Sequence, residues 1–315
     1  MPLPTDAPPD RARYGIQTGS WPLGMPASGS FYRDLAKQVE GRGYDLLFSG
    51  DHMFMHNPNA EPLTLLGSWA GTSERLLLGT GVLLPALREP LLVAKQLATL
   101  DFLSQGRLIV GVGVGGEIEQ EWRAMEIPRE QRGARTEEAL VLMRSFWNGE
   151  ELDFQGRFRT VSGVTGSPPT HAPGGPPIWI GGRSDAALRR AARHDGWCAY
   201  SSSLGRIERS LAAIAERRPA GLADFRVSFV IFTLVADTRD EARALAGEVL
   251  GRRYKQDFDH FLDSLCAVGT AEEVAERFRL YREAGVQDFL AVPQVPWQRY
   301  PEQVDRLADA IGIGG

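Results

Sequence analysis

Short runs of apolar and β-branched residues alternate along this chain with longer stretches in which Ala, Leu, Arg and Glu recur at helical spacing. Each short run is a predicted strand, and the stretches between the runs are predicted helices. An alternation of this kind makes neighbouring strands pair in parallel, because each helix carries the chain back to the same end of the sheet. The predicted strands cover residues 14–18, 44–49, 76–82, 108–112, 178–180, 196–200, 227–235 and 288–292.

Eight strand–helix units fit a closed (β/α)₈ barrel (a TIM barrel) with insertions, and an open, doubly wound sheet is the rival arrangement. Pro62 and Pro90 stand where helices would begin, and Gly285 stands where the last predicted helix would stop. We expect residues 1–315 to form one barrel domain.

Residues 151–177 interrupt the alternation. Residues 152–161 read as a hairpin that turns at Gln155 and Gly156, and residues 163–177 are rich in Pro and Gly. A linker between domains is one interpretation, but neither flank carries a complete barrel. We therefore expect an insertion that lies near the active site, because long ordered loops in compact domains are usually functional.

Composition and charge exclude several classes of protein. The chain has 315 residues, 43% of them hydrophobic and 24% charged, which is typical of a globular protein. A net charge of −5 argues against nucleic acid as a partner, and no run is long and apolar enough to span a membrane. The first ten residues lack the pattern of a signal peptide, and two cysteines make no disulfide framework. We expect a cytoplasmic protein whose partner is a small molecule.

The first candidate site is the sequence SGDH at residues 49–52, directly after a predicted strand. The C-terminal ends of the strands form the active face of an α/β barrel. His52 could donate or accept a proton near neutral pH, and the adjacent Asp51 could orient it. A structural histidine is the alternative. A metal pair with His56 is a weaker one, because Asn57 and Pro58 interrupt a helix there and no third ligand is evident.

Two glycine-rich strand ends suggest a floor for a flat ligand. Residues 111–116 (GVGVGG) match a dinucleotide-binding pattern, but the acidic residues at the required distance fall within a predicted helix. Gly111 and Gly113 would instead let a planar ring lie against bare backbone, and a packing turn is the alternative. Residues 78–82 (LGTGV) could form a bulge under the same ring or an ordinary exit from the strand.

A phosphate site is predicted where residues 178–184 (IWIGGRS) run from a strand into a helix. Backbone N–H groups and the positive charge of Arg183 would bind the anion, and Ser201 could add a hydroxyl. Simple capping of the helix by Ser184 is equally compatible with the pattern. None of the three lysines lies at a strand end, which argues against Schiff-base chemistry.

Taken together, these segments resemble the bacterial luciferase-like superfamily of flavin and deazaflavin oxidoreductases. The resemblance runs in order through nearly the whole chain, which makes it more specific than any single motif. It is carried by residues 43–52 (GYDLLFSGDH), 78–82 (LGTGV), 98–113 (ATLDFLSQGRLIVGVG), 177–182 (PIWIGG) and 268–274 (VGTAEEV).

The resemblance implies a TIM barrel that binds FMN or the deazaflavin coenzyme F420 at the C-terminal ends of its strands. It also implies that Asp51 and His52 contact the ring and handle a proton, and that a Glu after the glycine run assists. Glu117 is the candidate, but Gly115 and Gly116 stand where many deazaflavin members have one glycine, so Glu121 could replace it. For the cofactor, the resemblance implies a bulge, often with a cis peptide, at Thr80, Gly81 and Val82, and phosphate contacts from Gly181, Gly182, Ser184 and Ser201.

We therefore predict a coenzyme F420-dependent oxidoreductase that transfers hydride to or from a small organic substrate. His52 would be the general acid or base. The first alternative is an FMN-dependent monooxygenase that uses reduced flavin and O₂. The second is a non-catalytic flavin-binding protein, which an intact His52 disfavours. The resemblance also implies a possible homodimer, because the family is often dimeric.

Overall fold

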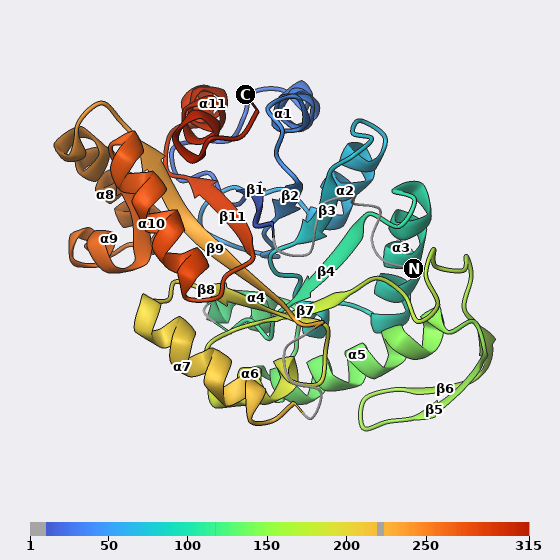
Figure 1. Ribbon diagram of the computed structural model, residues 1–315. Helices are drawn as coiled ribbons and strands as arrows, with labels where there is room; N and C mark the ends of the chain where they lie inside the picture. The colour runs from blue at the N-terminus through green and yellow to red at the C-terminus, as the bar shows by residue number, and fades with distance from the viewer. Residues whose placement is uncertain (1–10, 117, 219–223, 315) are drawn as a thin grey trace.

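Eight parallel strands close into a barrel in the computed structural model, which describes residues 11–116, 118–218 and 224–314 (Figure 1). The strands follow one another around the ring in the order β1-β2-β3-β4-β7-β8-β9-β11, and β11 pairs again with β1. This closure confirms the predicted barrel and excludes the open sheet. The barrel strands are β1 (Arg13–Thr18), β2 (Leu46–Ser49), β3 (Leu77–Thr80), β4 (Leu108–Val112), β7 (Ile178–Gly181), β8 (Gly196–Tyr200), β9 (Arg226–Val235) and β11 (Asp288–Pro293).

Helices surround the barrel, as Figure 1 shows. A further short strand, β10 (Cys266–Gly269), pairs with β9 outside the ring. No helix in the described ranges has the length and apolar character needed to cross a membrane. The helices are α1 (Ser30–Gly41), α2 (Pro62–Ala70), α3 (Pro90–Leu103), α4 (Glu119–Ala124), α5 (Arg132–Trp147), α6 (Asp185–Ala191), α7 (Leu204–Ala215), α8 (Arg239–Tyr254), α9 (Asp259–Leu265), α10 (Ala271–Glu283) and α11 (Tyr300–Ile311), with 3₁₀ turns at Pro85–Leu87, Arg129–Gln131 and Trp297–Arg299.

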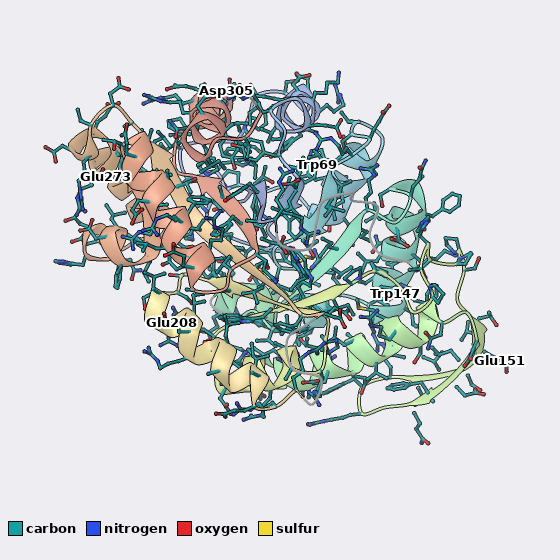
Figure 2. All side chains as sticks on the ribbon, in the orientation of Figure 1. Trp69, Trp147, Glu151, Glu208, Glu273 and Asp305 are labelled. Carbon is teal, nitrogen blue, oxygen red and sulfur yellow. The ribbon has the colours of Figure 1, made fainter. Side chains whose placement is uncertain are left out.

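The core fills both the barrel and the layer between strands and helices. All residues of β2 and β4 are buried, because one side of each strand faces the barrel interior and the other faces a helix. Trp69 of α2 and Trp147 of α5, both labelled in Figure 2, are buried in that outer layer. The indole of Trp147 donates a hydrogen bond to the carbonyl of Ala94 in α3. The barrel therefore forms a firm support for groups at its strand ends.

The segment 151–177 forms an antiparallel hairpin of β5 (Glu151–Gln155) and β6 (Thr160–Thr165), followed by a loop. The hairpin lies beside α5 at the edge of the molecule in Figure 1. The N–H groups of Arg157 and Phe158 donate to the carboxylate of Glu138 in α5. None of its residues is among those that line the cavity described below. That residues 151–177 lie near the active site stays a prediction.

One histidine between α6 and β8 should make stability depend on pH. Burial, followed by the charge of Arg144, lowers the pKa of His194 from 6.5 to about 4. The unfolded chain therefore takes up a proton at a higher pH than the folded protein. The stability that neutral His194 contributes is complete above pH 6.5 and is lost as the pH falls to about 4.

Replacing His194 with glutamine should therefore flatten the stability profile in that pH window. We expect the wild type to lose about 2 kcal/mol more unfolding free energy than His194→Gln between the two ends of the window. Urea unfolding at several pH values measures the difference. The exposed His260 supplies the control, since His260→Gln should keep the wild-type profile. Parallel profiles for the wild type and His194→Gln would contradict the prediction.

Candidate active site

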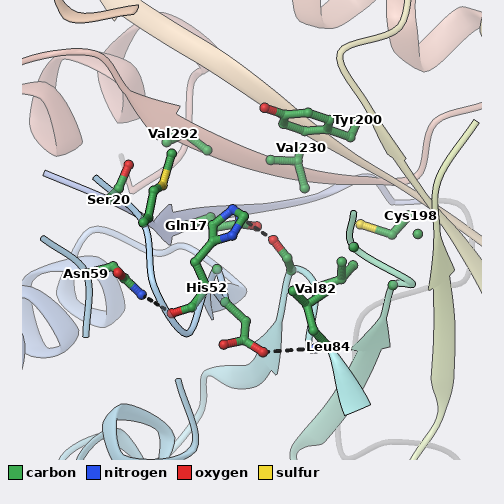
Figure 3. A pocket seen from close by; sticks show the side chains of 18 of the residues that line it. Gln17, Ser20, His52, Asn59, Val82, Leu84, Cys198, Tyr200, Val230 and Val292 are labelled. Atoms are coloured by element: carbon green, nitrogen blue, oxygen red, sulfur yellow. Dashed lines mark hydrogen bonds between the residues drawn. The ribbon is translucent and has the colours of Figure 1, made fainter. Parts of the chain in front are cut away.

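A cavity of about 250 Å³ opens at the C-terminal ends of the barrel strands (Figure 3). Its walls come from residues in or directly after β1, β2, β3, β4, β7, β8, β9 and β11, and from the end of α8. Of the residues predicted for the site, seven line this cavity: Asp51, His52, Gly81, Val82, Gly113, Gly181 and Gly182. The predicted residues Thr80, Gly111, Arg183, Ser184 and Ser201 do not line it, and Glu117 lies outside the described residues.

His52 is held in the cavity wall by a buried carboxylate. Its Nδ1 lies 3.3 and 3.2 Å from the two carboxylate oxygens of Glu121 in α4. The Glu121 side chain is 1% exposed and that of His52 is 28% exposed. Glu121 also accepts from the N–H of Phe54 (3.1 Å), and Asn59 donates to the carbonyl of His52 (2.6 Å). Glu121 thus holds the imidazole and Asn59 holds the backbone of His52, and the ring is directed into the cavity in Figure 3.

The glutamate that reaches His52 is therefore Glu121, the residue the sequence offered as a substitute for Glu117. Glu121 follows Glu117 by four positions in the sequence and lies in α4. The sequence alone did not decide between Glu117 and Glu121, because the extra glycine changes the distance between the glycine run and the glutamate. Glu121 is a carboxylate on a short helix that the sequence did not predict, and its complete burial against a histidine is typical of a functional pair.

Asp51 forms an ion pair with Arg88. Its carboxylate accepts two hydrogen bonds from the guanidinium of Arg88, at 2.6 and 2.9 Å, and a third from the N–H of Leu84 at 2.9 Å. Figure 3 shows the last of these as the dashed line at Leu84. Burial raises the pKa of Asp51, and the charge of Arg88 opposes that rise. Asp51 therefore braces the loop after β3, and its predicted roles in catalysis and cofactor binding stay predictions.

The glycines of the cavity floor let the chain pack closely around Val82. The peptide bond between Gly81 and Val82 is cis. A Cβ atom on Gly113 would come within 2.5 Å of the Val82 side chain, and one on Gly181 within 2.8 Å. Below the floor, the hydroxyl of Thr80 donates to the carbonyl of Gly111 at 2.7 Å. The ends of β3, β4 and β7 thus meet around Val82. A side chain at Gly113 or Gly181 would collide with this valine and displace it.

Gln17 is a site residue that the sequence analysis missed. It lies in β1, is 6% exposed and lines the cavity. Its Nε2 donates to the carbonyl of Gly81 at 2.6 Å, while its Oε1 has no hydrogen-bond partner among the described residues. A buried acceptor without a partner is costly unless a ligand supplies a donor. The only signal in the sequence was a glutamine next to Ile16 in a predicted strand.

The turn after β7 brings Arg183 and Ser201 together. Arg183 donates to the carbonyl of Ser201 at 3.2 Å, and Gly182 has a φ of +117°, which favours glycine. The hydroxyl of Ser184 accepts from the N–H of Ala187 and so caps α6. Arg183 is exposed and places a positive charge at this turn. The phosphate site predicted here stays a prediction.

The part of the wall formed by β8, β9 and β11 is mainly apolar and aromatic. Val230, Phe232 and Val292 line it, and the hydroxyls of Tyr200 and Tyr254 share a hydrogen bond. Cys198 also lines the cavity, but burial raises the pKa of its thiol to about 11. Cys198 therefore stays a neutral thiol and is unsuited to nucleophilic catalysis.

Comparisons with known proteins find similar sequences and solved structures. The family model described as luciferase-like monooxygenase matches residues 14–288. An F420-dependent glucose-6-phosphate dehydrogenase of Nakamurella multipartita is 29% identical and covers 97% of this chain and 81% of its own. An FMNH₂-dependent dimethylsulfone monooxygenase of Pseudomonas putida is 26% identical over 82% of this chain and 71% of its own. The crystal structure of monooxygenase RslO1 from Streptomyces bottropensis superposes with a TM-score of 0.84 at 24% identity, over 95% of this chain and 98% of that one.

Proposed function

Because the chain belongs to the luciferase-like monooxygenase family, we propose that it is a coenzyme F420-dependent oxidoreductase that transfers hydride between the deazaflavin and a small organic substrate. The observation that carries the proposal is the His52–Glu121 pair beside the glycine floor of the cavity. Several relatives about 30% identical to this chain are F420-dependent dehydrogenases, and this supports the deazaflavin over FMN.

The residues present fit a flavin-type ring. Gly81 and Val82 form a platform against which Gly113 and Gly181 pack, and a Cβ atom on either of those glycines would come within 2.8 Å of Val82. The unpartnered Oε1 of Gln17 is an acceptor at the edge of this platform, and the ring of either cofactor carries an imide N–H. We assign the ring to this platform, with Thr80 and Gly111 as its support.

The phosphate of the cofactor would then lie at the turn after β7. Gly181 and Gly182 bring the backbone close to the cavity, and Arg183 supplies the positive charge. Ser201 is held next to Arg183, and Ser184 shapes the turn by capping α6. Asp51 contributes to the ring platform instead, because it accepts from the N–H of Leu84, two residues after Val82.

When bound, the deazaflavin supplies two-electron hydride chemistry. His52 exchanges the accompanying proton with the substrate through Nε2, because Nδ1 is held by Glu121. The carboxylate of Glu121 fixes the ring orientation and stabilises the imidazolium when the proton is on His52. The apolar side chains of Val230, Phe232 and Val292 keep water away from the reacting groups.

A titration with the two cofactors tests this function. We expect F420 to bind at least about tenfold more tightly than FMN, measured by the fluorescence of each cofactor. The reverse preference would overturn the proposal in favour of an FMN-dependent monooxygenase, as in the Pseudomonas putida relative.

A glycine substitution shows whether binding occurs on the assigned platform. Gly113→Ala places a methyl group 2.5 Å from Val82, so it should weaken F420 binding by about 10- to 100-fold through overpacking. Gly247→Ala in α8 places its methyl group more than 4 Å from every atom outside the neighbouring backbone of its own helix, and it serves as the matched control. Equal affinities for the two variants would place the cofactor elsewhere.

A further inference from the structure

A buried arginine in the cavity wall has no role in the function proposed so far. Arg253 lies in the last turn of α8 and is 8% exposed. Its Nη2 donates to the carbonyl of Ser20 at 3.1 Å, and the guanidinium carbon lies 5.4 Å from the centre of the Phe232 ring. The carbonyl of Arg253 accepts from Asn57 at 3.2 Å, so the end of the helix is anchored as well. The guanidinium is therefore held in place at the cavity.

No carboxylate among the described residues balances this charge. Every ion pair in those parts of the chain involves other groups, and the Nε of Arg253 has no hydrogen-bond partner there. Its Nη1 lies 3.4 Å from where a Cβ atom of Gly19 would stand, and Gly19 itself lines the cavity. The carbonyl end of α8 compensates only part of the charge. A buried guanidinium without a counter-ion destabilises the folded protein unless a ligand brings the opposite charge.

The position of Arg253 separates it from the phosphate of the cofactor. Arg253 lies against Ser20, just after β1, whereas the predicted phosphate turn follows β7. Strands β1 and β7 are four places apart in the ring of eight, and so stand on opposite sides of the barrel. Figure 3 shows Ser20 at the edge of the cavity into which His52 points. The charge therefore faces the substrate side of the site.

We propose that Arg253 binds the carboxylate of a small organic acid, which is the substrate of the hydride transfer. This inference rests on the function proposed above for its redox step, but the anion site itself does not depend on it. The planar guanidinium matches a carboxylate in shape and charge. Val230, Phe232 and Val292 beside it suit an apolar body rather than a sugar. The acid is thus held by its charged end at Arg253, with its body along the apolar wall toward His52.

Binding of matched acids and amides to the F420-loaded protein tests the proposal. The probes are benzoate and phenylacetate, each compared with its neutral amide by calorimetry. We expect at least one acid to bind about 10- to 100-fold more tightly than its amide, the range of a charge-assisted hydrogen bond. Arg253→Met should remove this preference and leave amide binding unchanged, whereas Arg253→Lys should keep part of it. Arg252→Met, at an exposed neighbouring arginine that pairs with Glu248, should bind both like the wild type.

Wild-type protein that binds neither acid better than its amide would overturn the proposal, as would an unchanged preference in Arg253→Met. Retained F420 affinity in Arg253→Met shows that the variant is folded. The same titrations without F420 separate this proposal from the function. An acid preference without any F420 binding would support the anion site and reject the deazaflavin. F420 binding without an acid preference would support the deazaflavin and reject the anion site.

Discussion

Replacing His52 with glutamine is expected to lower the turnover number of the F420-loaded enzyme by about 10²- to 10⁴-fold, the usual contribution of a general acid or base. Glutamine keeps a hydrogen-bonding side chain of similar length, but it cannot exchange a proton near neutral pH. The affinity for F420 should change only a few-fold, because the ring platform is built from Gly81, Val82 and their glycine neighbours. Steady-state kinetics and a cofactor titration on the same preparation measure the two effects.

Two further variants make this result specific. His56→Gln removes an exposed histidine four residues away and should leave turnover unchanged. Glu121→Gln keeps a hydrogen-bond acceptor for Nδ1 but loses the charge, so the turnover number should fall by about tenfold, less than for His52→Gln, with little change in KM. Undiminished turnover in His52→Gln would contradict the catalytic role. Tight F420 binding by a wild type that turns over no substrate would instead favour the non-catalytic alternative.

Most of the barrel was predictable because its strands are buried on both faces. Runs such as LIVGV at Leu108–Val112 and GWCAY at Gly196–Tyr200 stand out between polar helices, and both have the bounds predicted for them. The strand predicted at residues 76–82 ends earlier, at Thr80, because the chain turns at Gly81 and Val82 into the cavity floor. The sequence shows where apolar runs lie, but it does not show where the backbone leaves the sheet.

The elements that the sequence analysis missed are short or amphipathic. Strand β10 is only four residues long, and α4 and α9 have six and seven residues. Helix α11 at Tyr300–Ile311 is a full amphipathic helix, with Val304 and Leu307 buried on one face and Gly312 at its end. The spacing of its apolar residues indicates a helix. The sequence analysis missed it because helices were sought between predicted strands, and no predicted strand follows α11.

The contacts of the site were hard to predict, because its side chains pair with residues that lie far away in the sequence. His52 and Glu121 are 69 positions apart, and Asp51 and Arg88 are 37 apart. The neighbouring positions of Asp51 and His52 suggested that one orients the other, yet adjacent residues at a strand end point in different directions. Consequently the strand end was predictable from residues 49–52, whereas the partner of each side chain depended on how the barrel brings its loops together.

The largest expected effect on stability arises at the other end of the barrel. Asp288, the first residue of β11, is fully buried and accepts hydrogen bonds from Arg13 of β1 and Arg226 of β9. The four contacts measure 2.6 and 2.9 Å to Arg13 and 3.0 and 2.7 Å to Arg226. Burial alone would raise the pKa of Asp288, but the two arginines lower it. The carboxylate is therefore ionised and joins three adjacent strands.

Asp288→Ala should destabilise the protein by about 3 to 5 kcal/mol, because it leaves the buried Arg13 without a counter-ion and Arg226 poorly compensated. Asp288→Asn keeps the size of the side chain but removes its charge, and should fall between Asp288→Ala and the wild type. Asp305→Ala provides the control: it breaks an ion pair with Arg42 at the surface, in which the Asp305 side chain is 49% exposed, and should cost less than about 1 kcal/mol. Urea unfolding near neutral pH compares the variants. A loss for Asp288→Ala no larger than that for Asp305→Ala would show that packing, rather than this ion network, holds β1, β9 and β11 together.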